Sequence, residues 1–433
     1  MEYLKKNSGV ISIWFLVLFP VFVWFFDTSF YIRTESVTNI LQALGQVTGI
    51  VGMVLFAVNL ILASRLKFFD KIFFGINKMY AYHHMLGGIA FSFLLFHPTF
   101  LVLQYASISF DAVRLFFAPS VEKAPVIFGV VSLWVMIFAL VATFYMHLKY
   151  QVWKGIHKFL GLAFFLGGIH AFLIPSTISN NAVLKYYMLA LSIFALGSAV
   201  YRSVLYKILV PTYKYTVREV KKINDVVFEI VLSPNSKRLS FVPGQFAFIS
   251  FDSKKVKSES HPFSMTSNPA NDTLSFVVKD LGDYTKSLPY LLPGDVASVE
   301  GPFGVFSSHK VSNRKQIWIA GGIGVTPFLS MARSLDLEDN IELIYLIRSE
   351  NEVVYGDELA LISSKNKNFK VTFWYSEKRG HITADGIKEI VSDIINRDVF
   401  ICGPVSLMRE LILQFKKIGI DDKMIHTEKF GFD

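Results

Sequence analysis

The sequence is poor in cysteine, with one residue in 433, and in charged residues, which make up only 18% of the chain. The single cysteine, Cys402, excludes a disulfide framework and a metal site built from thiolates, so any metal must be held by histidine or carboxylate. With 52% hydrophobic residues and a mean hydropathy of +0.44, the composition excludes a disordered chain and an ordinary soluble protein. It predicts that part of the chain lies in a membrane.

The positive charge is concentrated in the hydrophobic half of the chain. The net charge of the whole sequence is +9. Residues 1–206 hold 14 Lys and Arg against 6 Asp and Glu, a net of +8, whereas the rest of the chain holds 29 against 28, a net of +1. This placement favours a role in membrane orientation over binding to nucleic acid.

Uncharged runs long enough to cross a bilayer core of about 30 Å recur in the first half. They are 7–26, 36–64, 79–110, 124–147, 159–184 and 186–201. The first run lacks a small-residue cleavage site followed by a soluble domain, so we expect a retained helix and not a signal peptide.

The loops between these runs predict the orientation of the chain. Ten basic residues fall on one side and four on the other, which places both termini in the cytoplasm. The ten are Lys5, Lys6, Arg65, Lys67, Lys71, Lys78, Lys149, Lys154, Lys158 and Arg202, and the four are Arg33, Arg114, Lys123 and Lys185.

The patterning divides the chain into three domains. Residues 1–210 are predicted to form an α-helical bundle of six transmembrane helices. Residues 211–312 alternate apolar and polar positions between Pro and Gly turns, as at 246–251 and 274–279, which predicts an antiparallel β-barrel. Residues 313–433 show buried strands such as 317–320 and 341–347 separated by helical stretches, which predicts a doubly wound α/β domain. No internal sequence repeat is visible.

Four histidines in the hydrophobic half predict a metal or porphyrin site, because ionisable side chains in a bilayer are costly and usually functional. His83 and His97 lie in the third run, His157 lies just before the fifth and His170 lies within it. The spacings of 14 and 13 residues both correspond to about 20 Å along a helix. We therefore expect His83 to pair with His157 and His97 with His170, each pair holding one haem. Structural or proton-relay histidines are the alternative.

The angular positions of these histidines around their helices agree less well with the predicted pairs than their axial spacing does. A spacing of 14 residues returns within about 40° of the same helix face, but a spacing of 13 leaves His157 and His170 about 140° apart. The fifth helix must therefore bend, or the two haems must differ in azimuth. Four glycines in that helix provide room for close porphyrin approach or for such a distortion: Gly155, Gly161, Gly167 and Gly168.

Axial ligation by two histidines leaves no open iron position, so electrons must leave through the haem edge and any oxygen must be reduced without binding to iron. Arg114, in the loop after the third run, is a candidate for favouring a developing superoxide anion. The alternative is an ordinary solvated loop arginine.

Two motifs in the barrel segment predict a flavin site. Pro243-Gly244-Gln245-Phe246 begins a strand, and the segment from His261 to Ser267 follows one hairpin later. Together they offer a hydroxyl, backbone amides and an imidazole beside a flavin, with further candidates for its pyrophosphate. Turn chemistry in a barrel is the alternative. The candidates are Gln245, His261, Pro262, Phe263, Ser264, Thr266, Lys279, Gly282 and Thr285.

The segment 317–328 predicts a dinucleotide site, because a strand leads through a glycine-rich turn into a helix. The turn contains Gly321, Gly322 and Gly324, followed by Thr326 as a helix cap and Pro327 as the first helical residue. Cys402, Gly403 and Pro404 supply a second loop at the same edge of the sheet. Cys402 is expected near the nicotinamide and not as a nucleophile, since no partner for thiol catalysis is evident.

These segments resemble the ferredoxin-NADP reductase superfamily, and the whole chain resembles a bacterial member of the NADPH oxidase and ferric reductase family. The resemblance rests on the four histidines together with the motifs at His261–Ser264, Gly321–Pro327 and Cys402–Pro404 and on the near-terminal Phe430. It implies that the Ser264 hydroxyl contacts the flavin and that Phe430 covers the isoalloxazine.

The resemblance also bears on the coenzyme. Similar reductases hold the NADP 2′-phosphate with a Ser-Arg pair, which here corresponds to Ser376 and Arg379, and Arg348 offers another positive contact. Glu377 departs from the pattern, because a carboxylate repels a phosphate or binds a ribose hydroxyl of NAD. We expect NADPH, with NADH possible.

The resemblance implies a transmembrane NAD(P)H oxidase of the bacterial cell membrane. Electrons would pass from cytoplasmic NADPH through FAD and two b-type haems to extracellular oxygen, giving superoxide. A ferric-chelate reductase and an electron-delivery subunit for an extracytoplasmic protein are alternatives, and a channel without haem but with a nucleotide sensor is a third. Membrane lipid and oxygen are the expected partners. No EF-hand pattern or Pro-rich docking segment is visible, so we expect no obligatory cytosolic activator.

Overall fold

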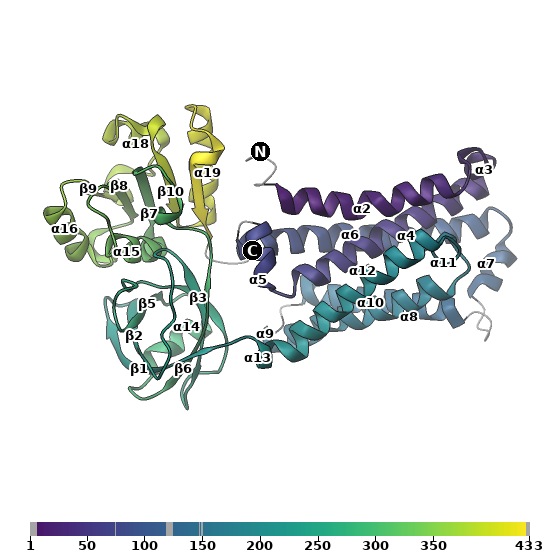
Figure 1. Cartoon of the computed structure of the whole chain (residues 1–433), viewed down its shortest axis with the longest axis horizontal. Helices are drawn as coiled ribbons and strands as arrows, with labels where there is room; N and C mark the ends of the chain where they lie inside the picture. Colours follow the sequence, from purple (N-terminus) through teal and green to yellow (C-terminus); the bar gives the residue numbers. More distant parts are fainter. Residues whose placement is uncertain (1–6, 74, 118–123, 147, 149, 430–433) are drawn as a thin grey trace. The chain divides into compact units, whose positions relative to one another are not determined.

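The computed structural model describes residues 7–73, 75–117, 124–146, 148 and 150–429. The chain divides into two compact units, Met1–Leu209 and Val210–Asp433 (Figure 1). The division lies one residue before the boundary expected from the sequence. Each unit is described by itself below.

The first unit is a helical bundle. Among the described residues, six helices are long and apolar enough to cross a membrane. A bilayer offers no water to the backbone, so a helix, which satisfies its own N–H and C=O groups, is the expected structure of each run. The spanning elements are α2 (Ser8–Asp27), α4 (Val37–Leu62), α6 (Ile76–Ala106), α8 (Ala124–Tyr145), α9 (Tyr150–His157) with α10 (Phe159–Leu173), and α12 (Ala182–Val200) with η2 (Tyr201–Leu205).

Shorter helices lie between the spans and after the last one. They are α3 (Phe30–Thr34), α5 (Lys67–Ile72), α7 (Phe110–Phe117), α11 (Thr177–Asn180) and α13 (Tyr206–Leu209). The helices α3, α7 and α11 lie at one end of the bundle and α5, α9 and α13 at the other (Figure 1).

The limits of the last two spans differ from those expected. The fifth span ends at Leu173 and the sixth begins at Ala182, whereas the sequence suggested apolar runs of 159–184 and 186–201. Ser176 closes a capping box that starts α11, and the side chain of Asn181 accepts from Leu184 N at 3.0 Å to start α12. The turn between these helices is uncharged, so a search for uncharged runs cannot detect it.

Helix α4 is the centre of the bundle. Within its most apolar window 72% of the residues are buried, against 28% or less in the other five spans. It packs closely on α6 through small residues: a Cβ at Gly45 would lie 2.8 Å from the Leu101 side chain, and one at Gly52 would lie 2.7 Å from that of Leu94. Small residues that let two backbones approach are the usual means of helix association in membranes.

The second unit begins with an antiparallel barrel of six strands in the order β4-β3-β6-β1-β2-β5. An isolated bridge between Met265 and Phe276 joins its two outer strands and closes the sheet. Every second residue of β6 is buried, the alternation expected of a strand with one face in a core. The strands are β1 (Tyr213–Lys222), β2 (Val227–Pro234), β3 (Phe246–Asp252), β4 (His261–Ser264), β5 (Leu274–Lys279) and β6 (Val296–Phe303).

The rest of the second unit is a parallel sheet of five strands in the order β11-β10-β7-β8-β9. Its strands are β7 (Lys315–Gly321), β8 (Asn340–Ile347), β9 (Phe369–Tyr375), β10 (Asp398–Cys402) and β11 (Ile425–Glu428). The chain leaves β7 toward β8 on one side and returns to β10 on the other, so the strand order reverses between β7 and β10. Ligands of open α/β sheets bind at the carboxyl ends of the strands at such a point.

Helices cover both faces of this sheet. Trp318 and Ala320 of β7 pack with Phe328 of α15 (Thr326–Ala332) and Leu359 of α16 (Gly356–Lys365). The alternate residues Ile317 and Ile319 pack against α18 (Ala384–Ile390) and α19 (Val405–Lys417) on the opposite face. The six-helix bundle, the antiparallel flavin-type barrel and the parallel α/β domain confirm the predicted fold class.

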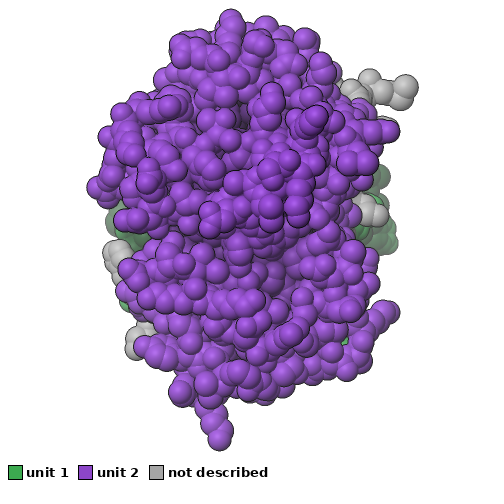
Figure 2. Space-filling model, turned by 90° about the vertical axis from the view of Figure 1, so that its left-hand side faces the viewer, with its two compact units in different colours: residues 1–209 green, residues 210–433 purple. Residues whose placement is uncertain are grey.

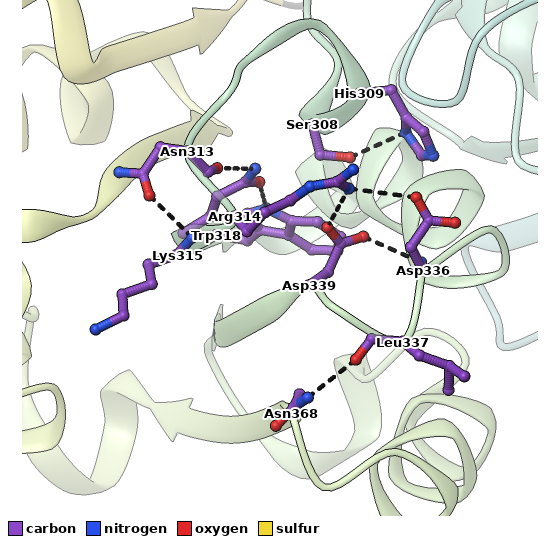
Figure 3. Close-up of polar contacts among 11 residues, drawn as sticks. Ser308, His309, Asn313, Arg314, Lys315, Trp318, Asp336, Leu337, Asp339 and Asn368 are labelled. Atoms are coloured by element: carbon purple, nitrogen blue, oxygen red, sulfur yellow. Dashed lines mark hydrogen bonds and ion pairs between the residues drawn. The ribbon is translucent and has the colours of Figure 1, made fainter.

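The amino-terminal edge of the parallel sheet is held by an ionic network (Figure 3). Arg314 donates to Asp339 at 2.8 Å and to Asp336 at 3.2 Å, and both carboxylates raise the pKa of its guanidinium. Trp318 donates its indole N–H to Gln316 inside the sheet at 2.9 Å. These contacts lie at the edge opposite the glycine turns and are structural.

The barrel and the α/β domain share apolar and polar contacts. Val227 and Val277 of the barrel belong to the same buried cluster as Trp318. Beside it, Tyr355 donates to Glu229 Oε2 at 2.6 Å, and Arg333 donates to Thr266 O at 2.7 Å. Glu229 and Arg333 line a polar hollow of about 530 Å³ between the barrel and the α/β domain of the second unit, which is coloured purple in Figure 2.

Candidate functional site

The four membrane histidines form two pairs across α6 and the α9–α10 segment. The ring centres of His83 and His157 lie 6.2 Å apart, and those of His97 and His170 lie 6.1 Å apart. The structure thus brings together the two pairs expected from the helix spacing. We call His83 and His157 the inner pair, which lies toward the end with α5 and α13, and His97 and His170 the outer pair.

These separations suit two imidazoles on opposite sides of one metal. A metal–nitrogen bond of about 2 Å on each side, and about 1.1 Å from each nitrogen to its ring centre, separates the two rings by roughly 6.3 Å. Among the described residues no group of three or more His, Cys, Asp or Glu side chains could hold an ion. Two facing imidazoles without further ligands fit a haem iron, whose other four ligands come from the porphyrin.

The neighbouring helices fix the tautomer of the histidines. The Nδ1 atom lies 3.1 Å from Asn59 O in His83, 2.7 Å from Gly45 O in His97 and 2.8 Å from Pro125 O in His170. A carbonyl only accepts, so Nδ1 must carry the proton, and Nε2 keeps its lone pair for a metal. In His157 the nearest partner is the Thr143 hydroxyl, 3.4 Å from Nδ1.

Two glycines make room for the outer pair, and neither was among the site residues predicted from the sequence. A Cβ at Gly49 of α4 would lie 2.7 Å from His97 Nδ1, and one at Gly129 of α8 would lie 2.6 Å from His170 Nδ1. Each glycine comes four residues after the carbonyl that accepts from the same histidine. A shared spacing of four residues, Gly45 to Gly49 and Pro125 to Gly129, was the available signal.

The fifth span is interrupted where the angular argument requires it. The helix α9 ends at His157 and α10 starts at Phe159. Around this point Lys158 N donates to Gly155 O and Gly161 N donates to Lys158 O, which are three-residue bonds. A 3₁₀ turn rotates by about 120° per residue, whereas an α-helix rotates by about 100°. Four residues in the tighter geometry therefore add roughly 80° of rotation, which reduces the angle of about 140° between His157 and His170 by that amount. The break thereby turns both histidines toward α6.

A buried aromatic residue lies midway between the two pairs. Phe164 follows His157 by seven residues and precedes His170 by six, so it lies about 10 Å along the helix from each. It is 2% exposed and packs edge-on against Phe56 of α4 at 5.3 Å. Phe56 and Phe164 therefore form an aromatic contact between α4 and α10 at a depth between the two pairs.

The two arginines near the outer end have opposite environments. Arg114 of α7 is exposed, whereas Arg33 of α3 is only 8% exposed. The guanidinium of Arg33 lies 3.5 Å over the Trp24 ring and donates to Trp24 O at 2.5 Å, while its Nη1 has no hydrogen-bond partner among the described residues. Trp24 in turn donates to Gln46 Oε1 at 3.0 Å, next to the Gly45 carbonyl that anchors His97.

In the barrel, the Ser264 hydroxyl is the group best suited to meet a flavin. It is buried and has no hydrogen-bond partner among the described residues. A buried polar atom without a partner is costly unless a ligand satisfies it. Three residues earlier in the same strand, His261 stacks on Tyr284 at 3.9 Å and lies 3.3 Å from Glu259 Oε2. Pro262 and Phe263 of the same strand are half-buried.

Other flavin candidates are occupied by internal contacts. Gln245 accepts from Val242 N and donates to Gly304 O, so its amide holds the turn before β3. Thr266 bonds to Ser275 at 2.9 Å inside the barrel. The Thr285 hydroxyl accepts from Gly282 N and caps α14 (Asp283–Ser287). Lys279, at the end of β5, is half-buried.

The two glycine loops meet at the carboxyl ends of β7 and β10. A Cβ at Gly324 would lie 2.2 Å from Cys402 O, and one at Gly403 would lie 3.0 Å from Gly321 Cα. These glycines are therefore needed for contact between the loops. Gly322 differs, since it has a φ of +53° and open space around its Cβ position. It is the glycine of the turn that leaves room for a pyrophosphate.

The expected helix start is wrong by one residue. The cap of α15 is Val325, and Thr326 is the first helical residue with Pro327 second. The Thr326 hydroxyl donates back to Ile323 O at 3.1 Å. A short 3₁₀ turn at Gly322–Val325 precedes the α-helix and takes over the place of the cap.

Cys402 lies at the end of β10 and is fully buried. Burial, with the nearby Glu428 carboxylate, raises the pKa of its thiol well above the usual value. The thiol is thus a neutral contact at the edge of the site, and Pro404 behind it is exposed. Glu428 pairs with Cys402 in the register of β10 and β11, and no sequence signal predicts this contact because the two residues are 26 apart. Phe430 lies outside the described residues.

Two of the cations at the expected binding site for the 2′-phosphate, after β9, form ion pairs with carboxylates. Arg348 bonds Glu377 at 2.9 Å and Lys378 bonds Glu350 at 2.8 Å. Arg379 stacks over Trp374 at 5.1 Å, and Ser376 begins the short helix α17 (Ser376–Arg379).

Comparison with protein families assigns three segments. Residues 48–168 match the ferric reductase like transmembrane component, residues 212–307 an FAD-binding domain and residues 318–411 the oxidoreductase NAD-binding domain. The chain therefore combines a ferric reductase like transmembrane segment with an FAD-binding and an NAD-binding domain, and its six apolar helices support a multi-pass membrane protein.

Relatives share the second unit. Flavohemoprotein A of Dictyostelium discoideum is 28% identical over 211 residues, 44% of this chain and 53% of its own. The ferredoxin reductase component of 3-ketosteroid-9-alpha-monooxygenase from Mycolicibacterium smegmatis is 30% identical over 200 residues, 45% and 56% of the two chains. The chain thus spans about half the length of these relatives. The flavohemoglobin of Malassezia yamatoensis, solved with FAD and heme, is similar in fold, with a TM-score of 0.52, 17% identity and coverage of 91% and 98%.

Proposed function

We propose a function from the premise that the chain has the architecture of the NADPH oxidase and ferric reductase family, with a ferredoxin-NADP reductase-like module. It acts as a transmembrane NAD(P)H oxidase that carries electrons from cytoplasmic NADPH through FAD and two b-type haems to extracellular oxygen, producing superoxide. The observation that supports this most strongly is the pair of facing imidazole sites, 6.2 and 6.1 Å between ring centres, in the same chain as flavin and nucleotide domains.

The bound cofactors supply the conversion of a hydride into single electrons and the one-electron carriers across the bilayer. The residues of the chain position them. The four histidines present Nε2, because carbonyls of α4 and α8 and the Thr143 hydroxyl accept from Nδ1. Phe56 and Phe164 pack α10 against α4 at a depth between the two pairs.

In the second unit, Ser264 offers the flavin a hydroxyl that has no other partner among the described residues. Gly322 gives the pyrophosphate of the nicotinamide coenzyme access to the carboxyl end of β7. Cys402 remains a protonated thiol at the same edge and contributes packing, since burial raises its pKa. Phe430 is proposed to cover the isoalloxazine.

We propose NADPH as the reductant, with NADH accepted. Arg348 and Lys378 are neutralised by Glu377 and Glu350, so they contribute little to binding a 2′-phosphate. Arg379, held on Trp374, is the cation of this corner that carries no ion pair among the described residues, and Ser376 lies three residues before it. A single unneutralised cation supports a moderate preference and not an exclusive one.

At the outer end we assign the electrostatic role to Arg33 in place of Arg114. An iron held by two histidines would leave oxygen to react without binding to it, and a buried guanidinium with a free N–H would then favour the developing anion. Arg33 has such a group and Arg114 is exposed.

A second candidate is ferric-chelate reduction by the same electron path. The match of residues 48–168 to the ferric reductase like transmembrane component favours it. The two functions differ in the acceptor at the outer pair. Delivery of electrons to an extracytoplasmic protein is a further variant of the same path.

The test uses the purified full chain in detergent with FAD and NADPH and no other protein, following cytochrome c reduction with and without superoxide dismutase. We expect the dismutase to inhibit the reaction and anaerobiosis to abolish it. Reduction that persists without oxygen would instead establish direct transfer to iron. Absence of a haem absorbance band from the wild-type protein would reject the haem proposal, and activity without added cytosol would agree with the expected independence from an activator.

The proposed location is a bacterial cell membrane with both termini in the cytoplasm, as the ten-to-four distribution of basic loop residues suggests. Protease added to intact cells should then leave the second unit uncut, whereas inverted vesicles should expose it.

A further inference from the structure

The two halves of the helical bundle anchor their histidines by the same pattern, with one exception. On α4, the anchoring carbonyls of Gly45 and Asn59 are 14 residues apart, and each accepts directly from a histidine of α6. On α8, the carbonyls at the matching 14-residue spacing are Pro125 and Ala139. Pro125 O accepts directly from His170, but Ala139 O does not accept from His157.

At His157, a threonine hydroxyl takes the place of the backbone carbonyl that meets each of the other three histidines. Thr143 donates to Ala139 O at 2.7 Å, and its oxygen lies 3.4 Å from His157 Nδ1. The hydroxyl hydrogen is used by the carbonyl, so the oxygen is left to accept from the imidazole. His157 therefore has a hydroxyl at long range where the other three histidines have a backbone carbonyl at 2.7–3.1 Å.

We propose that the Thr143 hydroxyl, because it is a weaker acceptor than the carbonyls that meet the other three histidines, leaves the inner iron site with a higher reduction potential than the outer site. This inference rests on the proposed function, because it concerns the haems that the two pairs would hold. It assigns Thr143 as a positioning residue that acts through His157.

The physical reason is the effect of the Nδ1 bond on the metal ligand. A strong acceptor at Nδ1 makes the imidazole more basic, and a more basic ligand stabilises the ferric state over the ferrous state. Both histidines of the outer pair donate to carbonyls at 2.7 and 2.8 Å. In the inner pair the bonds are 3.1 and 3.4 Å, and the second goes to a hydroxyl. Hydrogen bonds weaken as the distance lengthens, so the inner site favours its ferrous state more.

The difference in reduction potential determines how a single electron is distributed between the two iron sites. Transfer from the inner to the outer site oxidises one ferrous iron and reduces one ferric iron, and no proton or bond is exchanged. If the inner potential is higher, a single electron resides mainly on the inner site. The outer site, which meets the acceptor, is reduced as the acceptor withdraws electrons from it.

Variants of Thr143 separate this role from packing. Thr143→Val keeps the shape and removes the hydroxyl, and Thr143→Ser restores a hydroxyl. Ser132 provides a matched control on the same helix, because its hydroxyl donates to Ala163 O at 2.6 Å without contacting any of the four histidines. Ser132→Ala removes one interhelical hydroxyl contact as well.

The experiment is a potentiometric titration of the haem band of the purified full chain, with the ferric electron paramagnetic resonance spectrum recorded alongside. We expect two waves, of which Thr143→Val moves the higher one further positive and changes one ferric signal, while Thr143→Ser and Ser132→Ala leave both near the wild-type values. A midpoint unchanged in Thr143→Val, or a shift in the lower wave alone, would overturn the proposal.

The order of the sites is tested without altering Thr143. His97→Ala should remove the lower-potential wave and keep the higher one, and retention of the lower wave would overturn the proposal even if Thr143→Val failed to fold. Failure of haem binding is distinguishable, because the wild-type protein would then contain no haem to titrate, and a different electron acceptor would leave this titration unchanged.

Discussion

The imidazole of His170 occupies the space that a side chain at Gly129 would need. A Cβ there would lie 2.6 Å from His170 Nδ1, closer than carbon and nitrogen atoms approach without a bond. On the other half of the bundle, Gly49 stands in the same relation to His97. The outer pair therefore depends on two residues that have no side chain.

Gly129→Ala should displace His170 and weaken the outer haem site. We expect the haem content to fall from about two to about one per chain, because the inner pair lies some 20 Å away along the helices. Pyridine haemochrome analysis of the purified protein measures it. Gly88→Ala is the matched control, since a Cβ at Gly88 of α6 meets nothing within 4 Å. Equal haem loss in both variants would argue against a steric requirement for glycine at position 129.

Arg33→Gln should slow the final electron transfer, whereas Arg114→Gln should not. The first removes a buried guanidinium beside Trp24 and the second an exposed one. Removing a well-placed charged donor typically lowers such a rate by about tenfold or more. Reoxidation of the reduced haems by oxygen, followed by stopped flow, measures this step. Equal rates in the two variants would remove Arg33 from the proposed acceptor site.

Ser264→Ala should weaken flavin binding or slow hydride transfer by roughly fivefold, the loss of one hydrogen bond of about 1 kcal/mol. The hydroxyl has no protein partner among the described residues, so its removal leaves no protein group unsatisfied. Flavin retention and the rate of flavin bleaching by NADPH report the effect, and the haem spectrum serves as an internal control. A variant with normal flavin kinetics would show that Ser264 does not face the flavin.

Cys402 should resist alkylation in the folded protein at neutral pH. Its pKa is raised by burial and by Glu428, so the thiolate is scarce below the usual thiol pKa, and the sulfur is inaccessible. Because it is the only cysteine in the sequence, mass spectrometry of the iodoacetamide-treated chain reads it directly. We expect modification after unfolding in urea and very little before. Rapid labelling of the native chain would contradict the buried position.

The contact of Tyr355 with Glu229 should weaken in alkali. Burial, followed by the Glu229 carboxylate, raises the pKa of the Tyr355 phenol above its value in the unfolded chain. The contribution to stability is then complete below the unfolded pKa of about 10 and is lost as the pH rises toward the folded pKa. The melting temperature of the second unit should fall less steeply between pH 8 and 11 in Tyr355→Phe than in the wild type. Parallel curves would assign the alkaline loss to other tyrosines.

The fold followed from local sequence to a large extent. Six runs without charge had to become helices, because a bilayer leaves the backbone no other partner. The depth of the histidines was also predictable, since 13 or 14 residues along a helix fix an axial distance whatever surrounds it. The strand-turn-helix at Gly321–Pro327 indicated a dinucleotide domain for the same reason, because its signal lies within a dozen consecutive residues.

The details of the site depended on contacts between distant residues. Sequence alone could not show that Arg33 is buried and Arg114 exposed, because each lies in a short loop that carries charges of both signs between two apolar runs. It could not show that Thr326 follows a 3₁₀ turn and so does not cap α15, or that Gly324 meets Cys402 across the sheet edge.

The sequence therefore determined the kind of each element and the depth of each histidine, which are properties of one segment. Only the tertiary structure decided which carbonyl or hydroxyl each imidazole meets. That choice depends on the rotation of one helix against another, and the three-residue bonds around Lys158 set it for His157 and His170. A twist of this kind leaves composition and hydropathy unchanged, and it becomes visible when the helices are packed together.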